Sequence, residues 1–211
     1  MERIKEMLMD YYQKYPEVLK LAPWSEQYAY GEFPKYWEIL SCELSRLPLT
    51  LRIIEVGCGL GDVTALICGL GFHNIKAYEK SEEIFHAATH KIRLLFKRDN
   101  VVCHTAYPPK SAEKCDILIV VNCAYGDFVS NKDEYKALIR NYYDAAGCPQ
   151  TFYLEVIDSS YTQSDPEFPE YIRLSKEDIL SMFPNTFQES WRTYQYPINK
   201  RTKTLYKITK V

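Results

Sequence analysis

A glycine-rich stretch with acidic neighbours is the first feature of the sequence that is suited to binding a ligand. The segment "RIIEVGCGLGD", residues 52 to 62, leads from an apolar run into three glycines: Gly57, Gly59 and Gly61. Glycine lets a ligand approach the backbone and readily adopts the positive φ of tight turns. Glu55 and Asp62 bracket the turn, and two carboxylates repel a pyrophosphate but suit a ligand with cationic groups.

The spacing of the glycines also argues against a dinucleotide ligand. The dinucleotide fingerprint is G-x-G-x-x-G, and the helix that follows it holds the pyrophosphate at its N-terminus. Counted from Gly57, the third glycine of that fingerprint would fall at position 62, which is an aspartate; the third glycine of this chain is Gly61, one residue early. We therefore expect a ligand without phosphate.

The elements around this turn predict an α/β fold. From Leu51 onward, strand-like and helix-like segments alternate; the strands are expected at 51–57, 74–79, 100–106, 115–123 and 151–158, and the helices at 62–71, 81–98, 132–147 and 175–183. Such alternation predicts right-handed βαβ units and a mainly parallel sheet covered on both faces. The β-rich segments 186–197 and 201–211 predict a closing antiparallel hairpin, which gives seven strands.

The sequence "EVGCGLG" resembles the motif E/D-x-G-x-G-x-G of class I S-adenosylmethionine-dependent methyltransferases. The cofactor of that family carries a sulfonium and an ammonium group and no phosphate, in agreement with the acidic turn. The resemblance covers residues 51–211 and implies a three-layer Rossmann-like sandwich, with a seven-stranded mainly parallel sheet that ends in an antiparallel β-hairpin.

The resemblance also implies which residues hold S-adenosyl-L-methionine. Glu79, at the end of the second strand, corresponds to the acid that takes both ribose hydroxyls, since one carboxylate can accept two hydrogen bonds. Lys80 flanks the adenine side, Thr105 stands where the family has an acid, and Asn122 ends the fourth strand beside the methionine part of the cofactor. The full expected set is Glu55, Gly57, Cys58, Gly59, Gly61, Glu79, Lys80, Thr105, Asn122 and Tyr28.

Residues 1–50 form a separate N-terminal segment, with helices expected at 2–15 and 35–47 and an aromatic-rich stretch between them. In similar enzymes such a segment folds over the cofactor, and aromatic faces attract a sulfonium. Trp24, Tyr28 and Tyr30 are therefore candidate lid residues. The alternative is that they fasten the first helices to the sheet, and the sequence does not decide between the two.

Methyl transfer needs proximity, exclusion of water and, for some acceptors, removal of a proton. Candidate bases follow the fourth and fifth strands, where the ligand-facing loops begin: Tyr125, Asp127, Glu155, Asp158 and Tyr161. We predict Asp158, Asp127 and Tyr125 as catalytic residues. For Asp158 the alternative is an Asx-type turn.

Composition excludes several other functions. A net charge of −2, with cations and anions interleaved, is not the footprint of a protein that binds DNA. The seven scattered cysteines indicate neither a disulfide framework nor a zinc site, so we expect no metal and a reducing, cytoplasmic location. No apolar run approaches the length of a membrane span.

Together these patterns predict an enzyme that methylates oxygen or nitrogen of a small molecule. Two alternatives stay open: an RNA or protein methyltransferase, and a non-catalytic S-adenosylmethionine-binding module. A nicotinamide-dependent oxidoreductase is disfavoured by Asp62. The acceptor and the oligomeric state are not indicated by the sequence.

Overall fold

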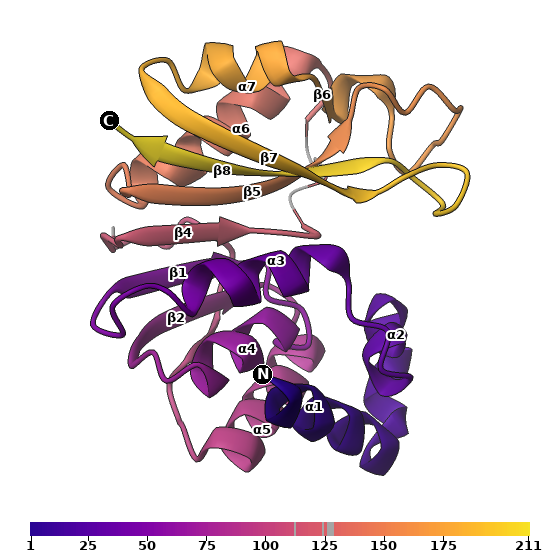
Figure 1. Cartoon of the computed structure of the whole chain (residues 1–211), viewed down its shortest axis with the longest axis vertical. Coiled ribbons are helices and arrows are strands. Elements are labelled where there is room, and N and C mark those ends of the chain that lie inside the picture. Colours follow the sequence, from indigo (N-terminus) through magenta and orange to yellow (C-terminus); the bar gives the residue numbers. More distant parts are fainter. Residues whose placement is uncertain (112, 124, 126–128) are drawn as a thin grey trace. The chain divides into compact units, whose positions relative to one another are not determined.

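The computed structural model describes residues 1–111, 113–123, 125 and 129–211. The chain divides into two units, Met1–Tyr107 and Pro108–Val211, which are described separately (Figure 1). This division does not test the predicted boundary between residues 50 and 51, which stays a prediction.

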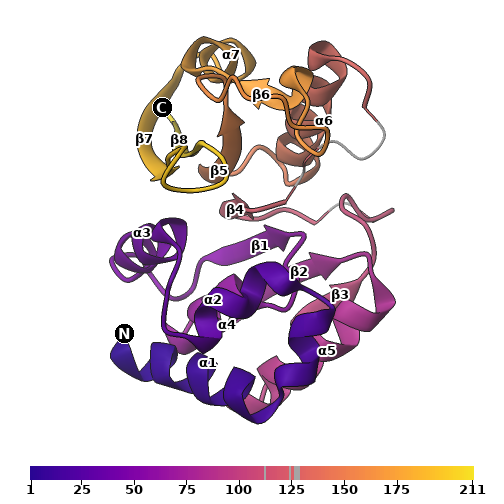
Figure 2. The same ribbon diagram turned by 90° about the vertical axis from the view of Figure 1, so that its right-hand side faces the viewer.

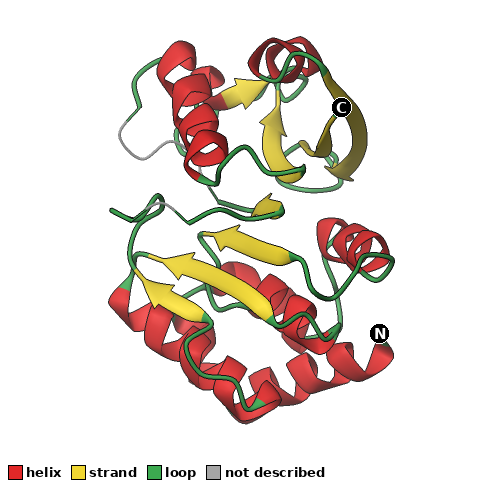
Figure 3. Ribbon diagram, turned by 90° about the vertical axis from the view of Figure 1, so that its left-hand side faces the viewer, coloured by secondary structure: helices red, strands yellow, loops and turns green. Residues whose placement is uncertain are grey.

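Three parallel strands form the sheet of the first unit, in the order β3-β2-β1 (Figure 3). They are β1 (Arg52–Val56), β2 (Asn74–Glu79) and β3 (Val102–His104). Four of the five residues of β1 are buried, as the apolar run predicts for a parallel strand covered by helices. Helices α4 (Asp62–Gly69) and α5 (Glu82–Phe96) follow β1 and β2 and pack against the sheet.

The N-terminal residues pack onto these two helices. Helix α1 (Glu2–Lys14) contacts α4, and so does α3 (Lys35–Leu44), as Figures 1 and 2 show. Between them the aromatic stretch forms short 3₁₀ helices at Pro16–Lys20 and Pro23–Ser25, followed by α2 (Glu26–Ala29). Frequent prolines explain why no long helix forms there.

A buried polar cluster joins four of these elements. The carboxylate of Asp62, the first residue of α4, forms an ion pair with Lys91 of α5 at 2.6 Å, and both side chains are nearly inaccessible to water. The hydroxyl of Tyr12 in α1 donates to the same carboxylate at 2.5 Å, and that of Ser25 donates at 2.7 Å. Since buried charges are tolerated only when paired and hydrogen-bonded, this cluster ties the N-terminal segment to the helix that follows the glycine turn.

The second unit contains the remaining strands. β4 (Ile117–Val120) and β5 (Thr151–Asp158) are parallel, β8 (Lys203–Lys210) runs antiparallel to β5, and β7 (Thr186–Tyr194) runs antiparallel to β8. A two-residue strand that the sequence did not predict, β6 (Arg173–Leu174), pairs with the end of β5. The helices are α6 (Lys132–Ala145) and α7 (Lys176–Met182), with a 3₁₀ turn at Glu170–Ile172.

The predicted fold class is confirmed. All seven predicted strands are present. Strands β1, β2 and β3 pair in parallel in the first unit, and β4 and β5 pair in parallel in the second. Strands β7 and β8 form the predicted antiparallel hairpin. The start of α7 also follows its sequence signal, because Ser175 and Asp178 form a reciprocal capping box.

The buried cluster leads to a prediction about stability. Replacing Lys91 by methionine should lower the free energy of unfolding by about 3–5 kcal/mol, because the carboxylate of Asp62 then stays buried without a cation. The measurement is urea unfolding followed by far-ultraviolet circular dichroism.

The controls use a second ion pair and a double variant. Lys5→Met breaks an exposed pair with Glu38 and should change stability by less than about 1 kcal/mol. Asp62→Asn combined with Lys91→Met should recover much of the loss. The assignment fails if Lys91→Met is no more destabilising than Lys5→Met.

Candidate functional site

The glycines of the turn after β1 have the positive φ angles that the sequence predicts for a tight turn. Gly57, Gly59 and Gly61 all lie in the left-handed region, with φ of 63°, 55° and 77°. A β-carbon on Gly59 would lie 3.5 Å from the indole Nε1 of Trp24. Any side chain at Gly59 would therefore be strained and would extend over the turn toward this indole.

The backbone N–H groups of the turn are already used within the protein. The N–H of Cys58 donates to the carbonyl of Tyr78 at 3.0 Å, that of Gly59 donates to Oε2 of Glu79 at 3.0 Å, and that of Gly61 donates to the carbonyl of Cys58 at 2.8 Å. A phosphate-binding loop works by directing such N–H groups at the anion. These three N–H groups are turned inward, so the turn fits a ligand without phosphate.

Glu79 is the residue of the predicted set whose placement is most specific. Its Oε1 accepts from the N–H of Ser81 at 2.9 Å, its Oε2 accepts from Gly59, and the residue is 8% exposed. A carboxylate has about four acceptor sites. Two therefore remain for a pair of hydroxyls, and the two N–H donors fix the direction in which they face.

The electrostatic reason given for a cationic ligand was partly wrong. Asp62 does not present an open negative charge, because Lys91 neutralises it within the buried cluster. Burial raises the pKa of Glu55 to about 8, against the opposing effect of its hydrogen bond from Thr64, so Glu55 is largely protonated at neutral pH. The inward-facing N–H groups and Glu79 now support the preference for a phosphate-free ligand.

The other predicted residues of the first unit lie in different surroundings. Cys58 is buried, and burial raises the pKa of its thiol well above the usual value. Lys80 and Thr105 are exposed, and the hydroxyl of Thr105 donates to the carbonyl of Ala106 at 3.3 Å. Beside them the ring of His104 stacks on Phe85 with centroids 5.1 Å apart. Their roles toward a cofactor stay predictions.

The three candidate lid aromatics separate in the structure. Trp24, 51% exposed, lies beside Gly59, as given above. Tyr28 is buried, its ring stacks on Tyr12, and its hydroxyl pairs with that of Tyr36 at 3.2 Å. Tyr30 is 71% exposed. Trp24 is thus the aromatic residue that the fold brings to the turn, whereas Tyr28 packs in the core of its unit.

In the second unit, two predicted residues meet around a buried lysine that the sequence analysis missed. The ammonium of Lys203 in β8 donates to Oδ1 of Asn122 at 2.6 Å and to the hydroxyl of Tyr125 at 2.7 Å. Tyr125 in turn donates to Oδ1 of Asn122 at 3.2 Å. Burial lowers the pKa of Lys203, and Glu155, whose Oε2 lies 3.7 Å away, opposes this effect.

Asn122 has an unusual backbone conformation at the end of β4. Its φ is 51°, in the left-handed region that asparagine tolerates better than most residues. Its N–H donates to Oε2 of Glu155 at 3.2 Å, while its side chain accepts from Lys203 and Tyr125. These contacts hold Asn122 from both its backbone and its side chain.

Asp158 lies at the end of β5 among hydrogen-bond donors. Ser160 donates to Oδ1 through both its N–H, at 2.9 Å, and its hydroxyl, at 2.6 Å; Thr204 donates to Oδ2 at 2.6 Å. Burial opposes ionisation, yet these hydrogen bonds and Arg192 hold the pKa of Asp158 below its usual value. The contact with the Ser160 N–H is the geometry of the Asx turn that was the stated alternative.

The surroundings of the other candidate bases that the structure describes, Tyr161 and Glu155, say less about function. The hydroxyl of Tyr161 donates to Asp165 at 3.2 Å, and Glu155 is buried between Thr193 and Lys203. Asp127 lies outside the described residues. Among the residues that the structure describes, no three His, Cys, Asp or Glu side chains gather as metal ligands, and no helix is both long and apolar enough to cross a membrane.

Comparison with known proteins adds evidence on the fold. No protein-family model and no curated protein matches the sequence. Solved structures do match: magnesium protoporphyrin IX methyltransferase (ChlM) from Synechocystis PCC 6803 with bound SAM has a TM-score of 0.64 and 13% identity over 98% of this chain and 97% of the other. A S-adenosylmethionine-dependent methyltransferase from Clostridium acetobutylicum ATCC 824 has a TM-score of 0.62 and 12% identity over 94% and 98%.

A third similar structure is the plantazolicin methyltransferase BpumL in complex with SAH, with a TM-score of 0.58 and 15% identity over 100% of this chain and 98% of the other. These likenesses span nearly the whole length of each chain. The chain therefore has the Rossmann-like fold of class I S-adenosylmethionine-dependent methyltransferases.

The raised pKa of Glu55 predicts a particular dependence of stability on pH. A carboxyl whose pKa is higher in the folded than in the unfolded chain stabilises the fold fully below its unfolded pKa, near 4.5, and loses this contribution as the pH rises through about 8. The free energy of unfolding of the wild type should therefore fall between pH 5 and 8.5 relative to that of Glu55→Gln, which mimics the protonated side chain.

Urea unfolding at a series of pH values measures this difference. It should amount to a few kcal/mol, because each unit of pKa shift corresponds to about 1.4 kcal/mol. Glu83→Gln, on the exposed start of α5, serves as the control and should follow the wild type. Parallel curves for wild type and Glu55→Gln would contradict the assignment.

Proposed function

We propose that the chain is an S-adenosylmethionine-dependent methyltransferase with a small-molecule acceptor, methylated on oxygen or nitrogen. The observation that carries the proposal is the turn after β1, where three left-handed glycines and inward-facing N–H groups adjoin the carboxylate of Glu79. The fold agrees with this reading. Several structural neighbours are described with bound SAM or SAH, and one as a putative O-methyltransferase.

In this proposal the first unit binds the methyl donor. Glu79 accepts the two ribose hydroxyls, the glycines leave room for close approach, and Trp24 covers the turn with an aromatic face, which attracts a cation. When bound, the cofactor supplies a methyl group activated by the positive charge on sulfur. Pyrophosphate-bearing ligands are disfavoured, since the turn offers them few free N–H donors.

The second unit offers a group that can hold a proton released by the acceptor. Of the described candidates, Tyr125 has the more suitable surroundings. The Lys203 ammonium donates to its oxygen and stabilises the phenolate form; this phenolate takes up the proton released by the acceptor and becomes the hydroxyl that donates to Asn122. Asp158 has a lowered pKa and four donors around it, so it accepts a proton poorly. A catalytic role of Asp127 stays a prediction. A reducing location such as the cytoplasm also stays a prediction.

Cofactor binding is the first test. Calorimetric titration should show binding of S-adenosylhomocysteine and none of NAD. Glu79→Gln should weaken that binding by about 10- to 100-fold, the range for hydrogen bonds to a charged group. Glu83→Gln removes the same charge from the exposed start of α5 and should bind like the wild type. NAD binding, or full affinity in Glu79→Gln, would overturn the cofactor assignment.

Methyl transfer is the second test. With cofactor labelled in the methyl group and a metabolite extract, the label should enter a low-mass product. Tyr125→Phe should slow this transfer by about 10²- to 10⁴-fold, the range for acid–base catalysis, and leave S-adenosylhomocysteine affinity unchanged. Tyr171→Phe is the control. Label in RNA or protein would favour an RNA or protein methyltransferase. Binding of the cofactor without methyl transfer to any of these acceptors would favour a non-catalytic S-adenosylmethionine-binding module.

A further inference from the structure

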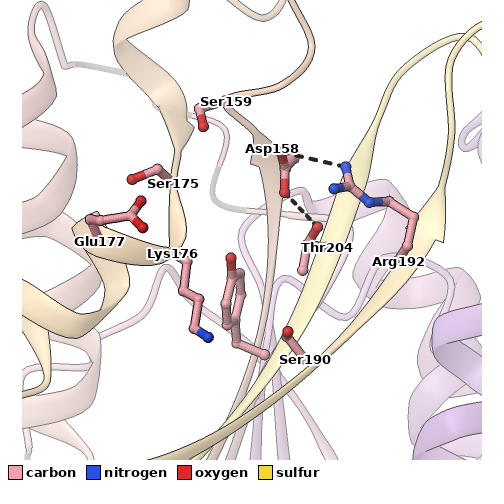
Figure 4. A pocket seen from close by; sticks show the side chains of 9 residues that line it. Asp158, Ser159, Ser175, Lys176, Glu177, Ser190, Arg192 and Thr204 are labelled. Atoms are coloured by element: carbon pink, nitrogen blue, oxygen red, sulfur yellow. Dashed lines mark hydrogen bonds and ion pairs between the residues drawn. The ribbon is translucent and has the colours of Figure 1, made fainter.

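A polar pocket in the second unit is not used by the proposed function. Its volume is about 410 Å³, and it is lined by Asp158, Ser159, Ser175, Lys176, Glu177, Ser190, Arg192, Thr204 and Tyr206 (Figure 4). The residues come from the end of β5, the start of α7, and strands β7 and β8. Asp158, Thr204 and Tyr206 are buried, whereas the charged side chains of Lys176, Glu177 and Arg192 are exposed.

The carboxylate of Asp158 in this pocket is already hydrogen-bonded within the protein. Asp158 receives hydrogen bonds from Ser160 and Thr204 and an ion pair from Arg192 at 3.4 Å, part of which Figure 4 shows. The pKa of Glu177 is lowered mainly by hydrogen bonds from its own backbone N–H and from Ser175. Both carboxylates therefore keep their charge, and that of Asp158 directs its acceptor oxygens at the protein.

Tyr206, Lys176 and Arg192 line the pocket and can donate hydrogen bonds to a ligand. Tyr206 is only 3% exposed as a residue and lines the pocket, and the structure describes no hydrogen bond of its hydroxyl. No hydrogen bond or ion pair of the Lys176 ammonium is described, although its charge lowers the pKa of the neighbouring Glu177. Arg192 is held through Nη1 by Ser160 at 3.1 Å, and its Nε and Nη2 have no described partner.

We propose that this pocket binds a small organic molecule through an oxyanion group, a carboxylate or a phosphate. Lys176 and Arg192 pair with the anion, and Tyr206 donates a hydrogen bond to it from the buried side. The Asp158–Arg192 contact holds one edge of the guanidinium and leaves the other edge free, which suits planar recognition of an oxyanion.

The test uses inorganic phosphate and succinate as separate probes of the full-length ¹⁵N-labelled protein, without methyl donor and at constant ionic strength. Saturable shifts of the backbone N–H signals of Ser175, Ser190 and Thr204 are expected with at least one probe. Saturation by phosphate alone identifies a phosphate ester as the ligand class, and by succinate alone a carboxylic acid. No saturable shift with either probe overturns the proposal, whatever the outcome for cofactor binding.

Matched variants distinguish a specific anion site from nonspecific electrostatic attraction. Lys176→Gln and Arg192→Gln should each raise the dissociation constant about tenfold, the effect of losing one charge-assisted hydrogen bond. Lys200→Gln removes the same charge from the exposed turn between β7 and β8 and should leave it unchanged. Equal effects of Lys200→Gln and Lys176→Gln would overturn the proposal.

Tyr206→Phe tests the buried donor. Because the structure describes no hydrogen bond of this hydroxyl, its removal should leave the melting temperature unchanged and weaken anion binding several-fold. Unchanged binding would remove Tyr206 from the site, and a lowered melting temperature with unchanged binding would show that the hydroxyl serves the fold.

Discussion

The buried ion pair between Asp62 and Lys91 is the interaction on which the first unit depends. It lies where α4 leaves the glycine turn, and through Tyr12 and Ser25 it includes two N-terminal elements. Removing two charges from water is strongly unfavourable unless the geometry is good. The N-terminal residues supply the hydroxyls that complete this geometry, so the position of the turn and the docking of the N-terminal segment are set by the same contacts.

The second unit has a comparable arrangement around Lys203. Its ammonium binds Asn122 and Tyr125 directly and lies 3.7 Å from the carboxylate of Glu155. The left-handed conformation of Asn122 is held by contacts to strands β5 and β8. In both units, then, a buried lysine on one element fixes the residues that follow a strand.

Much of the fold could be predicted because its signals are local. The apolar run of β1, the cap at Ser175 and the closing hairpin are each read from a few neighbouring residues, and Glu79 follows from its place at a strand end. Lys91 and Lys203 could not be read this way, since their partners lie 29 and 81 residues away along the chain. One signal for Lys91 was present: it is in helical register with Ala88 and Ile92, on the buried face of α5.

The inward-facing N–H groups of the glycine turn have a consequence for how ligands are discriminated. In most pockets selectivity rests on side chains and can be changed by replacing one of them. In this turn the relevant groups belong to the main chain: three peptide N–H groups are already hydrogen-bonded to Tyr78, Glu79 and Cys58 within the protein. To bind a phosphate through these three N–H groups, the turn would have to adopt a different backbone conformation.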